Sequence, residues 1–296
     1  MIGTFTNNFS WSLQRFTMFE RCKKEYFYHY YGSWAGWDGN AAERTKFIYR
    51  LKNIKSEAPW LKSIIKKTLS SAIKRETEFS LVSCRSFSIR TTYKDIFELE
   101  RQEFLDDPKK LCLDSIYFAE ESISNLKKRI TARLECFWNV IWENSFFNIL
   151  KEKRYGDFIS INGHGEFVLN NIKVWVNPGI AYTEKDKKFI IDIYPMPPKN
   201  EVNPPFSMSL AILFLKKTYK LLNEEYTPRT IIADKDKCIV LEECPPESEI
   251  SKLIRESSLN MLSCLTFDKK AYEENFYKTS EKEKCRTCRF REICAA

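Results

Sequence analysis

Three cysteines lie in the last twelve residues of the chain, in the stretch KCRTCRFREICAA. Cys285, Cys288 and Cys294 follow the spacing C-x2-C-x5-C. Thiols grouped at such short spacings are typical metal ligands, and a tetrahedral zinc site or an iron–sulphur cluster takes four protein ligands. The tail therefore predicts a metal centre that needs a fourth ligand from another part of the chain.

Cys22 is the best candidate for the fourth ligand. It lies in FERCKKEYFYHYY, where aromatic residues recur with it at spacings of three and four, so we expect a helix with the thiol on its apolar face. Gly32 follows as a stop signal. Cysteine behaves as a small hydrophobe, and the other cysteines are expected to be ordinary buried or free thiols. These are Cys84, Cys112, Cys136, Cys238, Cys244 and Cys264.

Composition sets the class of protein. The chain has 296 residues, 43% of them hydrophobic and 15% aromatic, which is enough for a substantial core. Its formal net charge of +8 permits a nucleic-acid partner without requiring one. The N-terminal sequence lacks the pattern of a secretory signal, and no apolar run reaches the roughly 18 residues of a membrane span. We expect a cytoplasmic location without membrane contact, where clustered cysteines bind metal rather than form disulfides.

The elements that must position these residues change in type near Gly156. Before it, the apolar periodicity predicts helices; after it, FISINGHGEFVLNNIKVWVNPGIAYTEKDKKFIIDIYPM predicts a strand meander. A helix, two further strands and a last helix follow, so the fold class is α/β. We expect one integrated domain of three parts: residues 1–155 helical with the first cysteine, 156–245 a sheet core, and 246–296 a helix with the cysteine segment.

The helix motif FxxCxxxYxY, combined with a distant C-x2-C-x5-C, resembles the iron–sulphur branch of the PD-(D/E)XK nucleases. That branch includes AddB-type and RecB-like exonucleases and the CRISPR-associated adaptation nuclease. The resemblance implies a PD-(D/E)XK nuclease-like mixed β-sheet core and a [4Fe–4S] cluster that joins the two ends of the domain. It makes Cys22, Cys285, Cys288 and Cys294 the ligands. An all-cysteine zinc site needs the same thiolates and stays open as the alternative.

The same resemblance places an active site on the hairpin VWVNPGIAYTEKDKKFIIDIYPM. The family holds Mg²⁺ or Mn²⁺ with an Asp on one strand and Asp/Glu-x-Lys on the next, often with a His on an earlier helix. Here Gly179 stands for the first acid and Tyr194 for the lysine, and Lys66 occupies the place of the His. Asp192 alone is kept, and one carboxylate is weak support for a divalent cation. The site is therefore expected to be degenerate, without bound Mg²⁺ or Mn²⁺.

These features predict a catalytically inactive iron–sulphur protein that binds nucleic acid, most simply DNA, or serves as an accessory subunit in a DNA-processing or defence complex. Its protein partner would be a helicase, a nuclease or another subunit. The candidate phosphate contacts are Lys66, Lys67, Lys127, Lys128 and Arg129. Two alternatives stay open. One is an active metal-dependent exonuclease with displaced residues, drawn from Glu166, Glu184, Asp186, Lys199 and Lys217. The other is a scaffold that binds only protein.

Overall fold

The computed structural model shows a mixed α/β protein in which helices predominate. It describes residues 9–74, 79–97, 101–110, 112–152, 158–160, 164–185, 187–197, 204–219, 225–234, 237–266 and 270–295. No helix within these ranges is long and apolar enough to cross a membrane. The expected boundary between residues 155 and 156 lies outside the described residues.

The helices and strands have the following bounds. The helices of the first half are α1 (Leu13–Arg21), α2 (Lys23–Phe27), the π-helical turn η1 (Tyr28–Gly32), α3 (Glu43–Asn53), α4 (Glu57–Lys74), α5 (Leu81–Phe97), α6 (Arg101–Asp106), α7 (Asp114–Ala119), α8 (Ile123–Trp142) and α9 (Ser145–Lys151). The later helices are α10 (Pro204–Thr218), α11 (Glu247–Leu262), the 3₁₀ turn η2 (Glu273–Asn275), α12 (Lys282–Arg286) and α13 (Arg291–Ala295). The strands are β1 (Ser10–Ser12), β2 (Ile54–Lys55), β3 (Cys112–Leu113), β4 (Phe158–Ser160), β5 (Gly165–Leu169), β6 (Ile172–Val176), β7 (Ile180–Glu184), β8 (Lys187–Tyr194), β9 (Tyr226–Asp234) and β10 (Lys237–Leu241).

The long helix α8 shows why the first half folds as helices. Its buried side chains recur at spacings of three and four, so they form one apolar face: Leu126, Ile130, Leu134, Phe137, Trp138 and Ile141. The Ser122 hydroxyl caps the helix by accepting the Asn125 N–H at 3.3 Å. The Trp138 indole donates to the Ser88 hydroxyl at 2.9 Å, so the buried face of α8 is also hydrogen-bonded to α5.

The single helix expected around Cys22 is interrupted at that residue. Cys22 adopts an extended backbone, with φ −165° and ψ 116°, and separates α1 from α2. The interruption is local, because the Cys22 N–H still donates to the Met18 carbonyl at 3.0 Å. The apolar periodicity continues across the break, which explains why the sequence predicts one helix. Cys22 is therefore half-buried at a helix break rather than on a continuous helical face.

The strands of the second half divide between two sheets, whereas the sequence predicts one mixed sheet core. One sheet has the order β10-β9-β8-β7-β4, with β8 and β9 parallel and the other neighbours antiparallel. The other has the order β1-β6-β5, and β1 from the start of the chain pairs with β6 in parallel. The short strands β2 and β3 form a third sheet. The strands of this region were predicted, but the meander was not correct, because β6 and β7 belong to different sheets and β4 pairs with β7.

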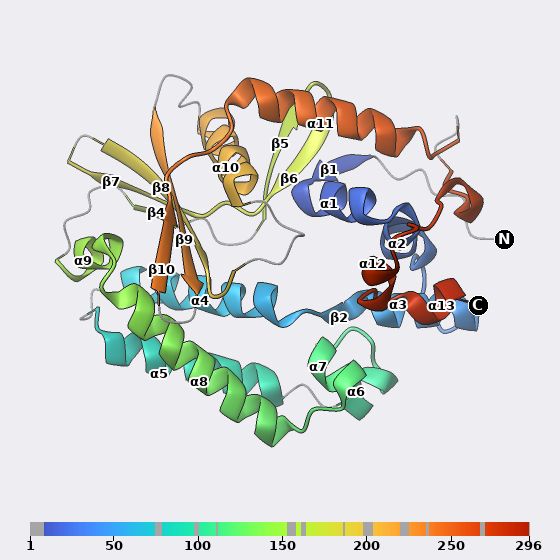
Figure 1. Cartoon of the computed structure of the whole chain (residues 1–296), viewed down its shortest axis with the longest axis horizontal. Coiled ribbons are helices and arrows are strands. Elements are labelled where there is room, and N and C mark those ends of the chain that lie inside the picture. Colours follow the sequence, from blue (N-terminus) through green and yellow to red (C-terminus); the bar gives the residue numbers. More distant parts are fainter. Residues whose placement is uncertain are drawn as a thin grey trace.

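Helices lie on both sides of the five-stranded sheet, as Figure 1 shows: α10 on one side, and α4, α5 and α8 on the other, while α11 packs on α10 and reaches β1. Helix α10 contacts strands of both larger sheets, β8 and β9 in one and β5 and β6 in the other. Helix α4 contacts β8 from the opposite side. The central hairpin strand β8 is thus enclosed, and the polar side chains on it must find partners inside the protein.

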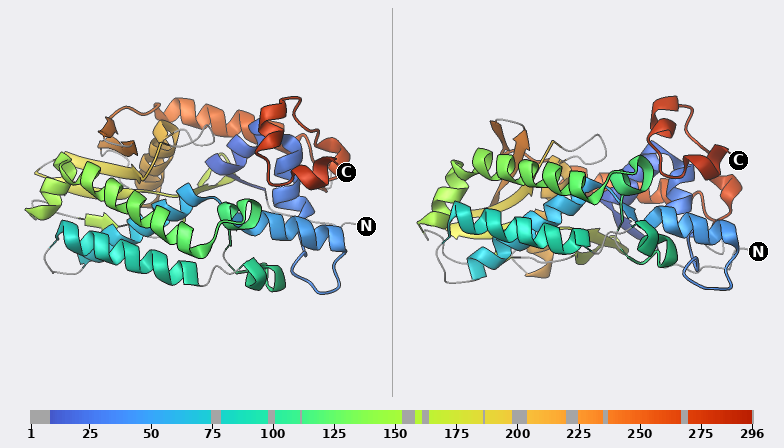
Figure 2. Two further views of the ribbon diagram at one scale, coloured as in Figure 1. Left: turned by 60° about the horizontal axis from the view of Figure 1, so that its bottom comes forward. Right: turned by 90° about the horizontal axis from the view of Figure 1, so that it is seen from below.

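The C-terminal elements α12 and α13 lie beside α2 and α3, more than 220 residues earlier in the chain, in all views (Figures 1 and 2). Glu273 contributes to this docking, because its carboxylate accepts from Arg44 at 2.9 Å and from the Tyr28 hydroxyl at 2.8 Å. The hydrogen bonds from Arg44 in particular lower the pKa of Glu273 to about 2. The buried Phe290 ring packs against Tyr28 at 5.6 Å. The tail is therefore attached by packing and ion pairs as well as by any metal.

Candidate functional site

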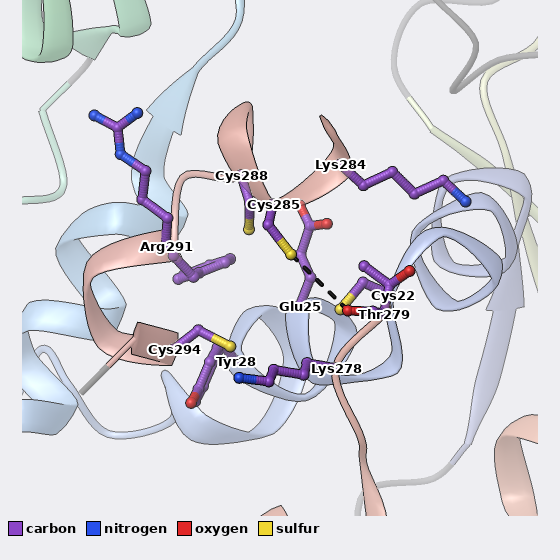
Figure 3. A pocket seen from close by; sticks show the side chains of 11 residues that line it. Cys22, Glu25, Tyr28, Lys278, Thr279, Lys284, Cys285, Cys288, Arg291 and Cys294 are labelled. Carbon is purple, nitrogen blue, oxygen red and sulfur yellow. Dashed lines mark hydrogen bonds between the residues drawn. The ribbon is translucent and has the colours of Figure 1, made fainter. Parts of the chain in front are cut away.

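The four cysteines that the sequence predicts as ligands line one cavity of about 190 Å³. Cys22 comes from the break between α1 and α2, Cys285 from α12, Cys294 from α13, and Cys288 from the turn between those two helices. Figure 3 shows the four sulphur atoms pointing into the space between them. Residues that are more than 260 positions apart in the sequence are thus brought to one place.

Short helices place the three tail cysteines. The Cys288 N–H donates to the Cys285 carbonyl at 3.1 Å, and the Cys294 N–H donates to the Phe290 carbonyl at 3.0 Å. The Cys285 thiol lies 4.0 Å from the Thr279 carbonyl oxygen, the contact drawn dashed in Figure 3. Two single helical turns joined by a tight connection therefore direct three thiols toward the same space.

Two of the thiols at the cavity, those of Cys288 and Cys294, are held in their protonated forms. Burial raises the pKa of Cys288 to about 12, with the charge of Glu25 as the next contribution. Burial also raises the pKa of Cys294, followed by the charge of Cys22. Glu25 lines the cavity too, but its carboxylate accepts from the Arg21 Nε at 2.8 Å. A metal must therefore displace protons from these sulphur atoms when it binds.

A zinc ion and an iron–sulphur cluster place different demands on the arrangement of four thiols. Within the described ranges, no three or more His, Cys, Asp or Glu side chains are arranged as the ligands of a metal ion. A single zinc ion would have to contact all four sulphur atoms at once. An iron–sulphur cluster is polyatomic and takes each thiolate on a different iron. The four thiols line one cavity without forming the ligand set of a metal ion, so a cluster at this place stays a prediction.

The six other cysteines lie away from this cavity, as expected. None of them is among its lining residues. Cys84, Cys112 and Cys264 are buried, and Cys136 is exposed on α8; Cys238 and Cys244 are half-buried.

At the hairpin, Asp192 forms an ion pair with a lysine that the sequence analysis did not single out. The Lys62 ammonium lies 2.5 Å from the Asp192 carboxylate, and the side chains are 18% and 10% exposed. The same ammonium lies 3.5 Å from the centre of the Tyr194 ring, a cation–π contact. Burial lowers the pKa of Lys62, an effect that the charge of Asp192 partly offsets. The carboxylate that a metal would require is neutralised by an amine.

Lys62 had a signal in the sequence that was missed. It stands four residues before Lys66, so both amines lie on one face of α4, and that helix packs on β8. Asp192 and Tyr194 are likewise two residues apart and share one face of β8. If these two faces are placed against each other, Lys62 lies near Asp192. Only the packing of α4 on β8 in the structure shows that the two faces do meet.

Gly179 has no room for a side chain. A Cβ atom at this position would lie 1.9 Å from the Ile191 carbonyl oxygen on β8. The chain just before β7 therefore approaches β8 more closely than any residue other than glycine allows. An acidic residue at position 179 would require the backbone to move.

Tyr194 is 6% exposed, and burial raises the pKa of its hydroxyl, with the charge of Asp192 next in effect. It presents a neutral phenol, and its ring contacts the Lys62 ammonium.

Lys66 faces the loop before β7. Its ammonium donates to the Asn177 side-chain oxygen at 3.0 Å and to the Pro178 carbonyl oxygen. Burial lowers the pKa of Lys66 to about 8; the charge of Asp192 raises it and that of Lys62 lowers it further. Lys66 is thus a half-buried cation near the hairpin, held by neutral acceptors.

We expect Lys66 to give the stability of the protein a specific pH dependence. Its pKa is about 8 in the fold and near 10.5 in the unfolded chain, so the unfolded chain binds more protons between these values. Stability relative to a Lys66→Met variant should therefore rise between pH 8 and 10.5, on the order of 1–2 kcal/mol after allowance for solvent screening. Urea unfolding of both proteins across this range measures the difference, and a flat difference would contradict the assignment.

The residues considered as displaced catalytic groups are not gathered at Asp192. Glu166 lies on the other sheet and forms an exposed ion pair with Lys173 at 2.7 Å. Glu184 pairs with Lys187 at the far end of the hairpin, roughly 16 Å along β8 from Asp192. Lys217 is exposed near the end of α10. Asp186 and Lys199 lie outside the described residues.

The remaining candidate phosphate contacts differ in availability. Lys67 on α4 and Lys128 on α8 are exposed, and the Lys127 ammonium lies 5.4 Å from the Tyr93 ring centre. Arg129 forms ion pairs with Glu57 and Glu121. The hydrogen bonds to Glu121 raise the pKa of Arg129, so its guanidinium is already occupied within the fold.

Comparisons with known proteins give little. No family model matches the chain, and no curated protein matches it. One solved structure with similarity is described as the crystal structure of SSO0001; it is 13% identical, with 78% of this chain and 93% of that chain covered. The TM-score of 0.29 is too low for that likeness to carry an argument about fold or function.

Proposed function

We propose that this protein is a catalytically inactive relative of the PD-(D/E)XK iron–sulphur nucleases that binds nucleic acid as an accessory subunit of a DNA-processing or defence complex. The observation that carries the proposal is the buried ion pair between Lys62 and Asp192. It puts an ammonium group against the one carboxylate of the expected metal site.

Hydrolysis of a phosphodiester explains why this arrangement argues against catalysis. The reaction needs a cation at the scissile phosphate and an activated water, which nucleases of this type obtain from a divalent metal. Such a metal takes several oxygen ligands. Here Asp192 is neutralised, and position 179 has no space for a second acid. An ammonium cannot lower the pKa of a bound water as a metal does.

The cysteine cavity supports the other half of the proposal. Cys22, Cys285, Cys288 and Cys294 would hold a [4Fe–4S] cluster, with zinc as the alternative metal. Bound there, the cluster would supply a covalent link between the start of the chain and its tail. A link of this kind stabilises the fold whether or not the hairpin catalyses a reaction. It would therefore explain why a protein with a degenerate hairpin site has four cysteines at the cavity.

Binding of nucleic acid is the use that the remaining charges fit best. The chain carries 48 Lys and Arg against 40 Asp and Glu. Lys67 and Lys128 are exposed on α4 and α8, two helices on the same side of the five-stranded sheet. Phosphate contacts by such side chains provide most of the affinity in sequence-independent binding.

The test uses the anaerobically purified holo-protein with labelled single- and double-stranded DNA. We expect no cleavage with Mg²⁺ or Mn²⁺ beyond that seen with EDTA, and weak binding that falls steeply as salt rises. Metal-dependent cleavage that Asp192→Asn abolishes would instead favour an active exonuclease. Absence of salt-sensitive binding to DNA or RNA would favour a scaffold that binds only protein.

A further inference from the structure

A group of cations without acidic partners lies where the N-terminal helices meet the tail. Arg15 comes from α1, Lys52 from the last turn of α3, and Arg289 from the turn between α12 and α13. The Arg289 guanidinium donates to the backbone carbonyls of Lys52, at 3.5 Å, and of Ile54. Arg289 is thus fixed against the end of α3.

Arg15 and His29 both pack against the Tyr30 ring. The Arg15 guanidinium lies 4.4 Å from the centre of the Tyr30 ring, and the His29 ring packs against the same ring at 4.6 Å. Burial lowers the pKa of His29 to about 3, followed by the positive charges of Lys52, Arg289 and Arg15. His29 therefore stays neutral, and its buried Nδ1 has no hydrogen-bond partner among the described residues.

Neighbouring cations have carboxylate partners among the described residues, which the cations of this group do not. Lys24 and Arg44, on adjoining elements, both pair with Glu273, at 3.2 and 2.9 Å. In the described part of the chain, no carboxylate pairs with Arg15, Lys52 or Arg289. Lys52 carries a further cost, because burial and the charge of Arg15 lower its pKa. Like charges held together and partly desolvated destabilise a fold unless an anion compensates them.

We propose that Arg15, Lys52 and Arg289, with His29 beside them, form a phosphate-binding cluster that contacts a phosphodiester of bound nucleic acid. This inference rests on the proposed function and adds a site away from the hairpin. Two guanidinium groups and an ammonium supply the positive charge and the N–H donors that phosphate oxygens accept. The neutral His29 ring, whose Nδ1 is buried and unpaired among the described residues, adds no charge to the three cations.

The position of Arg289 connects this cluster to the cysteine cavity. Arg289 directly follows Cys288 in the sequence and donates to the end of α3. The phosphate-binding cluster is therefore complete only when the tail is docked, since one of its three cations arrives from the tail. Nucleic-acid affinity would then depend on the integrity of the cysteine centre.

Lys52→Gln tests the cluster with opposite effects on binding and stability. The Lys52 side chain makes no hydrogen bond or ion pair among the described residues, so its loss breaks no internal bond. We expect the affinity of the holo-protein for a single-stranded oligonucleotide to fall about five- to tenfold. The slope of log affinity against log salt should become shallower by about 0.7. Stability without ligand should stay equal or rise, and Lys52→Arg should restore binding.

Lys252→Gln is the matched control, because Lys252 is exposed on α11 and its substitution removes the same charge. A second measurement compares thermal stability in inorganic phosphate and in chloride at equal ionic strength. Phosphate should stabilise the wild type and Lys252→Gln more than Lys52→Gln.

The outcomes separate this inference from the proposed function. If the wild type binds the oligonucleotide and Lys52→Gln binds as tightly as Lys252→Gln, the cluster assignment is overturned and nucleic-acid binding stands. If the wild type binds no oligonucleotide but phosphate stabilises it through Lys52, the anion site stands for free phosphate and the proposed function fails. If neither ligand acts through Lys52, the cluster assignment is overturned.

Discussion

Protein purified without oxygen is expected to contain about four irons per chain, and Cys22→Ser is expected to lose most of them. Cys22 is the one cavity cysteine outside the tail, so its loss disconnects the metal centre from the start of the chain. The link closes a loop of more than 260 residues. In the chain-entropy treatment, a link of this span stabilises the fold by about 5 kcal/mol. The midpoint of thermal unfolding should fall by on the order of 10 °C.

Cys244→Ser is the matched control for this experiment. Cys244 is half-buried, as Cys22 is, but does not line the cavity. Elemental analysis of both variants and the wild type distinguishes iron from zinc and gives the metal content per chain. If Cys22→Ser keeps the metal content of Cys244→Ser, then Cys22 is not a ligand and the fourth ligand must be sought elsewhere.

The sequence could predict that the four cysteines meet at one cavity because its evidence is chemical and local. The spacing C-x2-C-x5-C keeps three thiols close together in any fold, and the aromatic residues around Cys22 make it the candidate for the fourth position. The helix break at Cys22 could not be predicted in the same way. The apolar spacing continues on both sides of the extended residue, so the periodicity of the sequence does not reveal the helix break.

The hairpin was predicted as an element but not as a site. Alternation located β7 and β8, whereas the degeneracy of Gly179 and Tyr194 is implied only by the resemblance to the nuclease family and stays a prediction. The partner of Asp192 depends on how α4 packs against β8, a contact between segments about 130 residues apart. No pattern within either segment encodes that packing. The division of the strands into two sheets has the same origin, since β1 joins β6 from the opposite end of the chain.

The basic cluster of Arg15, Lys52 and Arg289 illustrates a further limit. Each residue alone is an ordinary surface cation in the sequence, and the runs KK and KKR attract more attention. The structure shows that Arg129, from one of those runs, is already paired with carboxylates, whereas Lys52 is not. Availability of a cation depends on its neighbours in space, which composition and charge runs do not report.

The second large effect is expected at the buried ion pair. Asp192→Asn keeps the shape of the side chain but leaves the Lys62 ammonium inside the fold without its counter-charge. Breaking a buried pair in this way should cost about 3 kcal/mol of unfolding free energy. Glu166→Gln is the control, because it breaks an ion pair whose side chains are 44% and 50% exposed, where the cost should be below about 1 kcal/mol. Urea unfolding of the three proteins at pH 7 measures both costs.

The double variant Lys62→Met, Asp192→Leu separates the ion pair from simple packing. It removes both charges and fills the space with apolar atoms, so most of the stability lost in Asp192→Asn should return. Lys62→Met alone leaves Asp192 open to a cation, yet Mg²⁺-dependent cleavage of DNA should still be absent. Position 179 cannot carry a second carboxylate without moving the chain against Ile191, and one carboxylate holds a divalent ion poorly. Cleavage gained by Lys62→Met would mean that the lysine blocks a competent metal site, and the assignment of a degenerate site would then be wrong.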